Sequence, residues 1–546
     1  MADQPAPSKP QAAPRKKKRR LLKVLLAIVA LLVFLHLPIG NEGLRISPET
    51  TLVTGPLRPD GTVDYIAAFN AECSKDVTPE NNAAPLLARA LGSGFLGPGT
   101  VDERTEKYDK PDDRVLGPLG LRPDGLDGND MFVSWSSWLL EVHGESATRG
   151  DGNDSLYPDD ETYDDPSLLL TRLWAGQKHP QIDPWLKRNE GALELVAKAS
   201  RRSRYYVPSV CYFAPITFGT SSVESVRLVT DAAMALRVRS VVYAKMGHLD
   251  GAWEDVLAIH RLARLIGQKP LILHKAVAWK LDGLAAQSGI HLATRWPVPE
   301  GLAQYVVERL NRIGRPGPLR GGLWGERLIM LDLAQKRYGD ASRLPFDQRL
   351  TVPVFLARSS NVNALLERTN WWYDRQDRAM ETPSLRARIA ALDALAREKR
   401  GLSTGWELAE ITGLWGGGWP CRGEFSRKLV DKAIPMLPQL SLGGAERVAA
   451  GSQARCTIEV TAIALARFHE AEKRWPLRLD ELVPKYADAV PLDVFTGGPI
   501  AYISRPDGYL LHSVGPNMRD DQGRSGAKGA DDIVASIPAE PTTRGS

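Results

Sequence analysis

A long apolar segment near the start of the chain constrains its architecture more than any other feature. Residues Leu21 to Ile39 are almost all apolar, and about 20 such residues in a helix cross the hydrocarbon core of a bilayer. Six consecutive basic residues, Arg15 to Arg20, precede the segment, and basic flanks typically face the cytoplasm. The pattern predicts a single-pass cell-membrane protein with a basic cytoplasmic tail at 1–20, a transmembrane anchor at 21–39 and an extracytoplasmic body.

The alternative interpretation of the same segment is a cleaved secretory signal. Such a signal has an apolar region of about 7 to 15 residues, followed by a cleavage site between small residues. Here the apolar region is longer, and it ends in Leu37-Pro38-Ile39-Gly40 without such a site. We therefore favour an anchor that keeps the protein in contact with the membrane.

The distribution of charge gives no support for a nucleic-acid partner. The formal net charge is +5, but residues 1–23 contain eight lysines and arginines and one aspartate, which is +7. The remaining 62 basic and 64 acidic residues leave the body at about −2. Because binding to a phosphate backbone depends on a basic surface, we expect no nucleic-acid partner.

Residues 43–183 have the pattern of a lead segment with turns, short helices and an acidic irregular stretch. The spacing predicts a helix from Tyr65 to Cys73, and Thr78 followed by Pro79 is typical of the start of a second helix. The four cysteines match no zinc pattern, so two disulfides and four separate thiols both remain open. They are Cys73, Cys211, Cys421 and Cys456.

Residues 184–450 carry the apolar periodicity of α-helices. Apolar side chains recur at three- and four-residue steps along three successive stretches between residues 222 and 284. A tight turn at Gly247 to Gly251 predicts that the first two of these helices pack antiparallel. The stretch Tyr243 to Leu265 resembles one tetratricopeptide hairpin, with Tyr243 and Ala252 at positions that this repeat uses. The resemblance implies an α-helical array that binds protein partners.

Residues 454–538 change to an α+β pattern, and residues 539–546 have the composition of a disordered tail. A helix leads to Trp475-Pro476, and the alternating segments IAYIS and YLLHSV follow, joined by the hairpin signal Arg505 to Gly508. With the segments PLDVFTGGPIAY and GPNMRDDQG, this order resembles the globular domain of type II secretion pseudopilins, especially the major one. The resemblance implies a long helix packed on a small antiparallel sheet.

In the pseudopilin family the loop after the last strand binds calcium, and the resemblance extends this expectation to the present chain. Asn517 stands where the family has its first aspartate ligand, Asp532 matches a later one, and Asp520, Asp521 and Asp531 are neighbouring carboxylates. Calcium takes about six to eight oxygen ligands, which such a loop supplies. A solvated turn without an ion is the alternative.

Two further comparisons concern the whole chain. A pseudopilin begins with a processing site and has a glutamate five residues into its membrane helix; this chain has neither, so we do not expect it to be processed or polymerised as a pilin. Its layout, including the segments GPLRPDGTVDYIAAFN and SKDVTPENNAAPLLARALG, is similar to that of a family of uncharacterised membrane-anchored proteins from planctomycete-type bacteria. That family has no established activity.

The expected fold is mainly α, and two classes of function remain for it. No HExxH, CxxC or phosphate-binding loop occurs in the sequence. This favours an envelope interaction or scaffold protein, which the resemblance links to secretion or pilus-like assemblies. The alternative is an envelope hydrolase or carbohydrate-binding protein with a site near Trp371, Trp372 and Trp415, because aromatic rings stack on sugars.

Overall fold

The computed structural model describes most of the body of the chain. The described residues are 43–97, 111–143 without 125 and 129, 180–210, 217–339, 361–402, 441–525 and 529–538, with short pieces at 23, 25–26, 101–102, 107–108, 170, 173, 176, 427–428 and 430–431. The predicted anchor at 21–39 therefore lies outside the described residues, apart from Lys23, Leu25 and Leu26. Among the helices that are described, none has the length and apolar character needed to cross a membrane.

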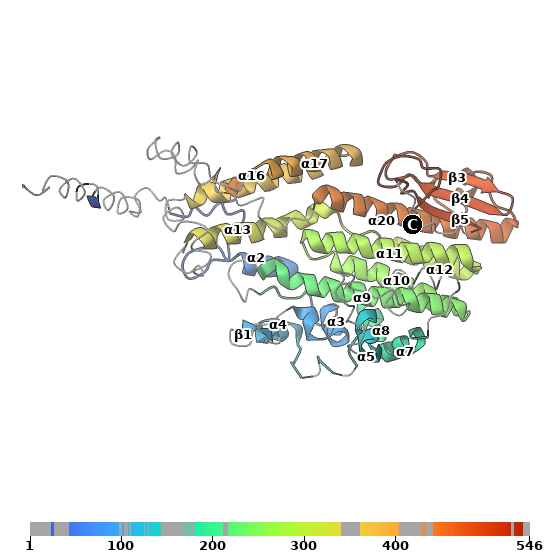
Figure 1. The fold of residues 1–546 in the computed structure, drawn as a ribbon, viewed down its shortest axis with the longest axis horizontal. Helices are drawn as coiled ribbons and strands as arrows, with labels where there is room; N and C mark the ends of the chain where they lie inside the picture. Colours follow the sequence, from blue (N-terminus) through green and yellow to red (C-terminus); the bar gives the residue numbers. More distant parts are fainter. Residues whose placement is uncertain are drawn as a thin grey trace, which may run out of the picture.

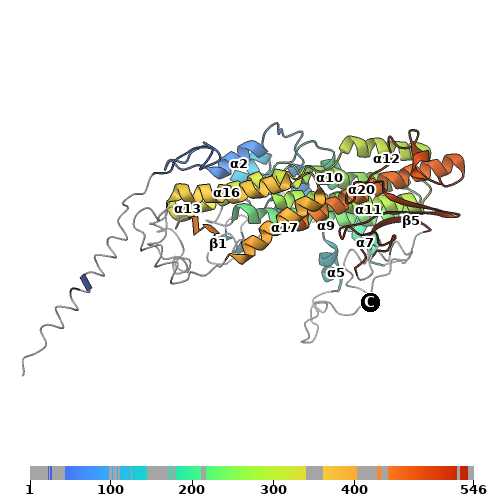
Figure 2. The ribbon, with the colours of Figure 1, turned by 90° about the horizontal axis from the view of Figure 1, so that it is seen from above.

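The described body is mainly helical, with a small antiparallel sheet near its C-terminal end, which confirms the expected fold class at this level. The molecule is elongated, and its long helices run roughly along the long axis in stacked layers (Figure 1). The sheet covers one end of the body, and α13 and α16 lie toward the other end (Figures 1 and 2).

The elements have the following bounds. The helices are α2 (Tyr65–Cys73), α3 (Ala84–Leu91), α4 (Asp113–Leu116), α5 (Trp135–His143), α7 (Ile182–Arg188), α8 (Glu190–Ser200), α9 (Thr217–Lys245), α10 (Leu249–Ile266), α11 (Ile272–Arg295), α12 (Glu300–Ile313), α13 (Leu323–Gly339), α16 (Val362–Met380), α17 (Leu385–Gly401) and α20 (Leu442–Glu472). Short 3-10 turns span Ser93–Leu96, Gly117–Leu119, Leu319–Gly322 and Leu479–Leu482. The strands are β1 (Val101–Asp102), β2 (Lys107–Tyr108), β3 (Ala501–Arg505), β4 (Gly508–Ser513) and β5 (Ile533–Ile537).

The start of α3 differs from the prediction made at Thr78. Instead, the backbone amide of Thr78 donates to Asn81 Oδ1 at 2.8 Å, and the backbone amide of Asn81 donates to Thr78 Oγ1 at 3.3 Å. The Asn82 side chain accepts from the amide of Ala84, and Pro85, which has no backbone N–H, lies in the first turn of the helix. Helix α3 therefore begins six residues after Thr78, whereas α2 has its predicted bounds.

The predicted tight turn joins α9 to α10. Gly247 has a positive φ of 81°, a conformation that glycine adopts without steric cost. At the start of α10, a Cβ on Gly251 would stand only 3.0 Å from the Tyr243 ring, so this small residue allows the two helices to approach closely. The fully buried Ala252 follows in the same turn.

Helix α20 connects the helical layers to the sheet. It packs along α11, and its apolar side chains, such as Ile458 and Leu465, share a core with Tyr509 and Leu511 of β4. Strands β3 and β4 form the predicted hairpin, with Arg505 opposite Gly508, and β5 pairs antiparallel with β4 to make the order β3-β4-β5. The predicted boundary between residues 450 and 454 falls inside this continuous helix.

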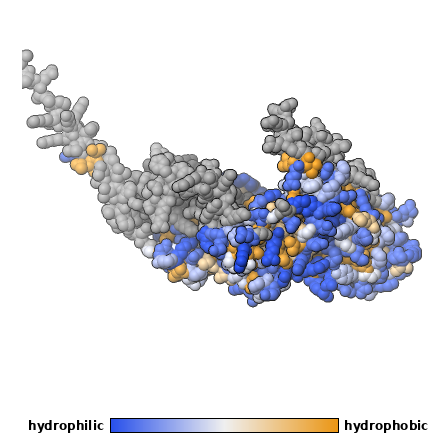
Figure 3. All heavy atoms as spheres, turned by 90° about the horizontal axis from the view of Figure 1, so that it is seen from below, coloured by the Kyte–Doolittle hydropathy of each residue, from blue (hydrophilic) through white to orange (hydrophobic). Residues whose placement is uncertain are grey.

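The surface gives no sign of a single large apolar patch on the face shown in Figure 3. Hydrophilic side chains predominate there, and apolar ones are scattered among them (Figure 3). Several of the exposed large apolar side chains come from separate elements, for example Val223 of α9, Val448 of α20 and Ile503 of β3, whereas Leu140 and Val142 both lie on α5. Apolar residues that are exposed singly are ordinary on the surfaces of globular domains.

Candidate functional site

The five predicted calcium ligands lie in the loop between β4 and β5, and the structure divides them into two adjacent groups. Asn517, Asp521 and Asp531 form the first group. The Asn517 amide nitrogen donates to Asp521 Oδ2 at 2.8 Å and to the carbonyl oxygen of Gly529 at 3.1 Å. The backbone amide of Asn517 donates to Asp531 Oδ2 at 3.0 Å, and that of Asp531 donates to Asp521 Oδ2 at 3.2 Å.

One oxygen of this first group lacks a donor. Asp531 Oδ1 is buried and accepts no hydrogen bond from the described residues. Burial raises the pKa of Asp531, and the nearby charge of Asp521 raises it further. Asp531 as a whole is half-buried, but an ionised carboxylate with one buried oxygen that lacks a donor is costly beside a second carboxylate, which makes this position a candidate for a cation.

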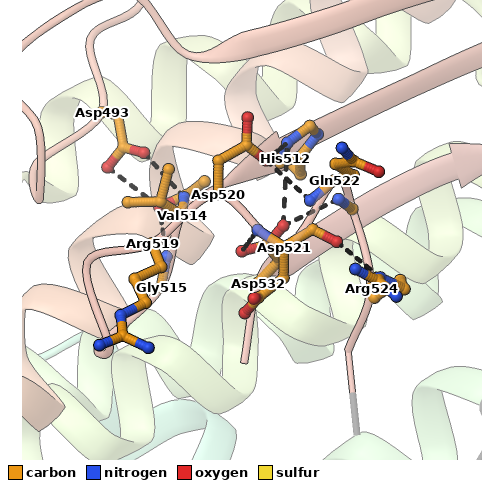
Figure 4. Close-up of polar contacts among 12 residues, drawn as sticks. Asp493, His512, Val514, Gly515, Arg519, Asp520, Asp521, Gln522, Arg524 and Asp532 are labelled. Carbon is orange, nitrogen blue, oxygen red and sulfur yellow. Dashed lines mark hydrogen bonds and ion pairs between the residues drawn. The ribbon is translucent and has the colours of Figure 1, made fainter. Parts of the chain in front are cut away.

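Asp520 and Asp532 belong to a second group, around His512. His512 Nε2 lies 3.0 Å from Asp520 Oδ1 and 3.8 Å from Asp532 Oδ2, and the three side chains point toward one another in Figure 4. Hydrogen bonds to the Gln522 amide and to His512 hold the pKa of Asp520 below its ordinary value. Burial raises the pKa of Asp532, whose oxygens accept from the backbone amides of Asp521 and Gly523.

The two groups suit different ions. Asp521, Asp531 and the carbonyl oxygen of Gly529 are hard oxygen donors, which calcium prefers. The Asn517 side-chain nitrogen donates to two of these oxygens, and its oxygen accepts from the Arg519 backbone amide at 2.7 Å, so the amide has to rotate and give up these bonds to present its oxygen to an ion. The second group contains an imidazole, which suits zinc or another transition metal better than calcium. The geometry therefore places the calcium candidate at Asn517, Asp521 and Asp531.

His512 was not among the predicted site residues. It lies in β4, where the residues on both faces are buried, and only 3% of its side chain is exposed. A histidine inside an otherwise apolar strand was the signal in the sequence, but its partners come from a loop that folds back over the strand. Local spacing could not identify them.

Asp493 supports the start of the same loop. Its Oδ1 accepts from the Phe495 amide at 2.9 Å and from the Ser513 hydroxyl at 3.0 Å, and its Oδ2 accepts from the Val514 amide at 2.9 Å. The residue is 3% exposed. Asp493 thereby fixes the segment before β3 to the end of β4, where the carboxylate loop begins (Figure 4).

A second polar cluster, which the sequence did not indicate, is buried between α10, α11 and α20. His260, Asp282, Cys456 and Glu459 all have 0% exposure. His260 Nδ1 lies 2.6 Å from Asp282 Oδ1, and His260 Nε2 lies 3.3 Å from Glu459 Oε2. The Cys456 thiol donates to Asp282 Oδ2 at 3.2 Å, and Arg264 forms an ion pair with Asp282.

The electrostatics of this cluster match a compensated ion network. Burial alone would lower the pKa of His260, but the charges of Glu459 and Asp282 outweigh it and raise that pKa. Burial alone would raise the pKa of Asp282, but His260 and Arg264 outweigh it and hold the pKa well below the ordinary value. The network therefore pairs an imidazolium and a guanidinium with two carboxylates.

The same cluster has the composition of a metal site, since ligand atoms of His260, Asp282 and Cys456 lie within 4.8 Å of one another. However, two ligands of one tetrahedral zinc ion stand about 3.3 Å apart, whereas the His260 and Asp282 atoms are 2.6 Å apart. Burial also raises the pKa of the Cys456 thiol, with a further contribution from Asp282, which favours the protonated donor. The geometry favours hydrogen bonding over metal coordination.

The predicted aromatic site at Trp371 and Trp372 is occupied by the chain's own side chains. Trp372 is buried, and its indole nitrogen donates to Asp431 at 2.9 Å. The guanidinium groups of Arg368 and Arg375 lie 3.8 and 4.5 Å from the centre of the Trp371 ring. A sugar ring would have to displace one of them, and Trp415 lies outside the described residues.

Comparison with known proteins adds no family to this description. The chain matches no family model, no curated protein and no solved structure. The resemblances to a tetratricopeptide hairpin, to the pseudopilin domain and to the uncharacterised envelope family therefore stay predictions, and the candidate site rests on its own geometry.

Proposed function

We propose that this chain is a membrane-anchored scaffold protein of the cell envelope whose C-terminal module binds calcium. The apolar segment 21–39 tethers it, the helical layers provide contact surfaces for protein partners, and calcium fixes the loop between β4 and β5. The buried Asp531 Oδ1 without a donor, beside Asp521, carries the calcium part of the proposal. The pseudopilin resemblance connects the module with secretion or pilus-like assemblies.

The bound ion would act structurally. An ion at Asn517, Asp521 and Asp531 would tie the two ends of the loop together and remove the repulsion between two neighbouring carboxylates. Anything that binds only the folded state stabilises it by about 2.7 kcal/mol at a concentration one hundred times its Kd. The loop would then present a defined surface at the exposed end of the sheet.

Calcium is expected to raise the melting temperature of the purified full chain, compared with the same protein in excess chelator. The expected rise is about 1 °C for each kcal/mol gained, because the unfolding entropy of a chain of 546 residues is roughly 1.1 kcal/mol/K. Asp531→Asn is expected to abolish the rise. Because burial and the charge of Asp521 raise the pKa of Asp531, removing its charge is expected to leave the melting temperature the same or higher when calcium is absent.

Asp488→Asn is the matched control. Asp488 is exposed and lies outside the loop, and its substitution removes the same negative charge. It should keep the full response to calcium. A wild-type protein that melts at one temperature with calcium and with chelator would remove the calcium site, and so would an Asp531→Asn variant that still responds.

Membrane fractionation tests the tether separately. The full chain is expected to sediment with membranes and to stay there after washing at high salt and alkaline pH, because only an apolar anchor resists both treatments. A chain that lacks residues 1–39 is expected in the soluble fraction. Recovery of the intact chain from the soluble lysate would contradict the anchor and the localisation.

A further inference from the structure

A concavity of about 730 Å³ lies between the end of α8, α10 and α12, and arginines dominate its wall. Arg201 and Arg202 follow α8, whereas the others come from the two longer helices. The arginines are Arg201, Arg202, Arg261, Arg264, Arg309 and Arg312, and the one acidic residue of the lining is Glu254. The volume is in the range of small-molecule sites, about 300 to 1,000 Å³.

This concentration of charge is local. The body of the chain is close to neutral, so six arginines around one concavity do not follow from its composition. The lining contains no lysine. Arginine differs from lysine in presenting a planar fork of donors that matches the oxygens of phosphate and carboxylate groups.

The arginines divide into those that the chain already pairs and those that it does not. Glu254 accepts from Arg201, Arg261 and the Tyr305 hydroxyl, at 3.2, 3.3 and 2.6 Å, so it orients one wall. Arg264 turns inward to Asp282 and to the carbonyl oxygen of Gly314.

Arg309 and Arg312 differ from the paired arginines. They stand three residues apart, on one face of α12. Neither forms an ion pair with a carboxylate of the described residues, and the Arg309 guanidinium rests on the Tyr305 ring at 4.9 Å. Their donors are therefore available to a ligand.

We propose that this concavity binds a small molecule that carries a diphosphate group. A diphosphate concentrates several negative charges and many acceptor oxygens in a compact group, which the unpaired guanidinium groups of Arg309 and Arg312 can bind while the other arginines of the lining add positive charge. An acidic peptide spreads single charges along its backbone and matches so compact a cluster less well. The diphosphate belongs either to a soluble molecule or to a lipid headgroup, since the chemistry of recognition is the same.

Isothermal titration of the purified full chain with pyrophosphate tests this site. We expect saturable binding with a Kd well below ~1 mM, weakened as sodium chloride increases because salt screens the attraction. The double variant Arg309→Gln/Arg312→Gln is expected to bind about 100-fold more weakly, at roughly tenfold for each charged hydrogen-bond partner lost. Arg312→Gln alone, at an exposed position, should cost about tenfold.

Arg386→Gln/Arg397→Gln is the matched control, because both arginines are exposed on α17, away from the concavity. It should bind as the wild type does. Farnesyl diphosphate distinguishes the two sources: affinity equal to that of pyrophosphate indicates a soluble ligand, and affinity at least tenfold tighter indicates a lipid. Absence of binding, equal binding by the α12 variants, or tighter binding of hexaglutamate than of pyrophosphate would each overturn the proposal.

Discussion

Asp282→Ala is expected to lower the free energy of unfolding by about 3 to 5 kcal/mol, because it leaves two buried cations without their shared partner. Asp282 accepts from His260, from Arg264 and from the Cys456 thiol, and its side chain has no exposure. Removing one member of a buried ion network exposes the others to the full cost of desolvation. Urea unfolding followed by tryptophan fluorescence measures the change.

Two further variants serve as comparisons for Asp282→Ala, one milder substitution at the same position and one surface control. Asp282→Asn keeps the shape and one acceptor oxygen, so it should cost less than the alanine variant and remains measurable if the latter does not fold. Asp488→Ala removes an exposed carboxylate and should stay within about 0.5 kcal/mol of the wild type. If Asp282→Ala and Asp488→Ala unfolded at the same urea concentration, the network would contribute nothing to stability.

The pH dependence of this difference follows from the two shifted groups. The pKa of His260 is raised in the folded chain, so its contribution is complete below about pH 6.5 and is lost as the pH rises through the folded value. The pKa of Asp282 is lowered, so its contribution is complete above about pH 4 and is lost as the pH falls. The gap between the wild type and Asp282→Ala should be largest between about pH 4 and 6.5. A gap that widened toward pH 9 would contradict a protonated His260.

Elements that depend on neighbouring residues could be predicted from the sequence. The helix Tyr65–Cys73 and the hairpin at Arg505 to Gly508 have the predicted positions, since spacing and turn residues determine both locally. The predicted start of α3 was wrong, because Thr78 bonds to Asn81 instead of capping a helix. The apolar pattern of the sequence does not distinguish a turn from a helix start at this position. Local sequence rules thus predicted the type of each of these elements more accurately than its first and last residues.

The buried network could not be predicted from residue spacing, because its members are far apart in the sequence. His260 and Asp282 are 22 residues apart, and His260 and Glu459 are 199 apart. Cys456 and Glu459 stand three residues apart on one face of α20, but this helix also buries Glu446, Ser452 and Thr461, so the pair does not stand out in the sequence. Periodicity shows that such a face is buried, but the helix that covers it is fixed only by the tertiary fold.

The candidate calcium loop could be predicted only in part from the sequence. Its carboxylates are close in sequence, so they could be named in advance, but the sequence did not show that Asp520 turns to His512 while Asp521 faces Asp531. Alternate residues in a loop point in directions that its hydrogen bonds decide. The backbone amides of Gln522 and Asp531, which donate to Asp520 and Asp521, set those directions here.

Asp493→Ala is expected to destabilise the C-terminal module by about 3 kcal/mol, because it removes the acceptor of three hydrogen bonds in a site that is 3% exposed. The backbone amides of Phe495 and Val514 would be left without a partner, and a buried unsatisfied group costs about 1 to 3 kcal/mol. Asp493→Asn should lower the stability by about half as much. Its remaining oxygen still accepts from Phe495 and Ser513, whereas its amide nitrogen faces the Val514 amide, which is also a donor.

Thermal unfolding of the full chain, with and without calcium, measures this effect, and Asp507→Ala in the exposed hairpin turn is its control. The Asp493 variants are expected to melt earlier under both conditions and also to respond less to calcium, since Asp493 holds the end of β4 from which the carboxylate loop departs. A loss of stability with an unchanged calcium response would show that the loop is shaped independently of this anchor. Melting equal to that of Asp507→Ala would contradict the role of Asp493 altogether.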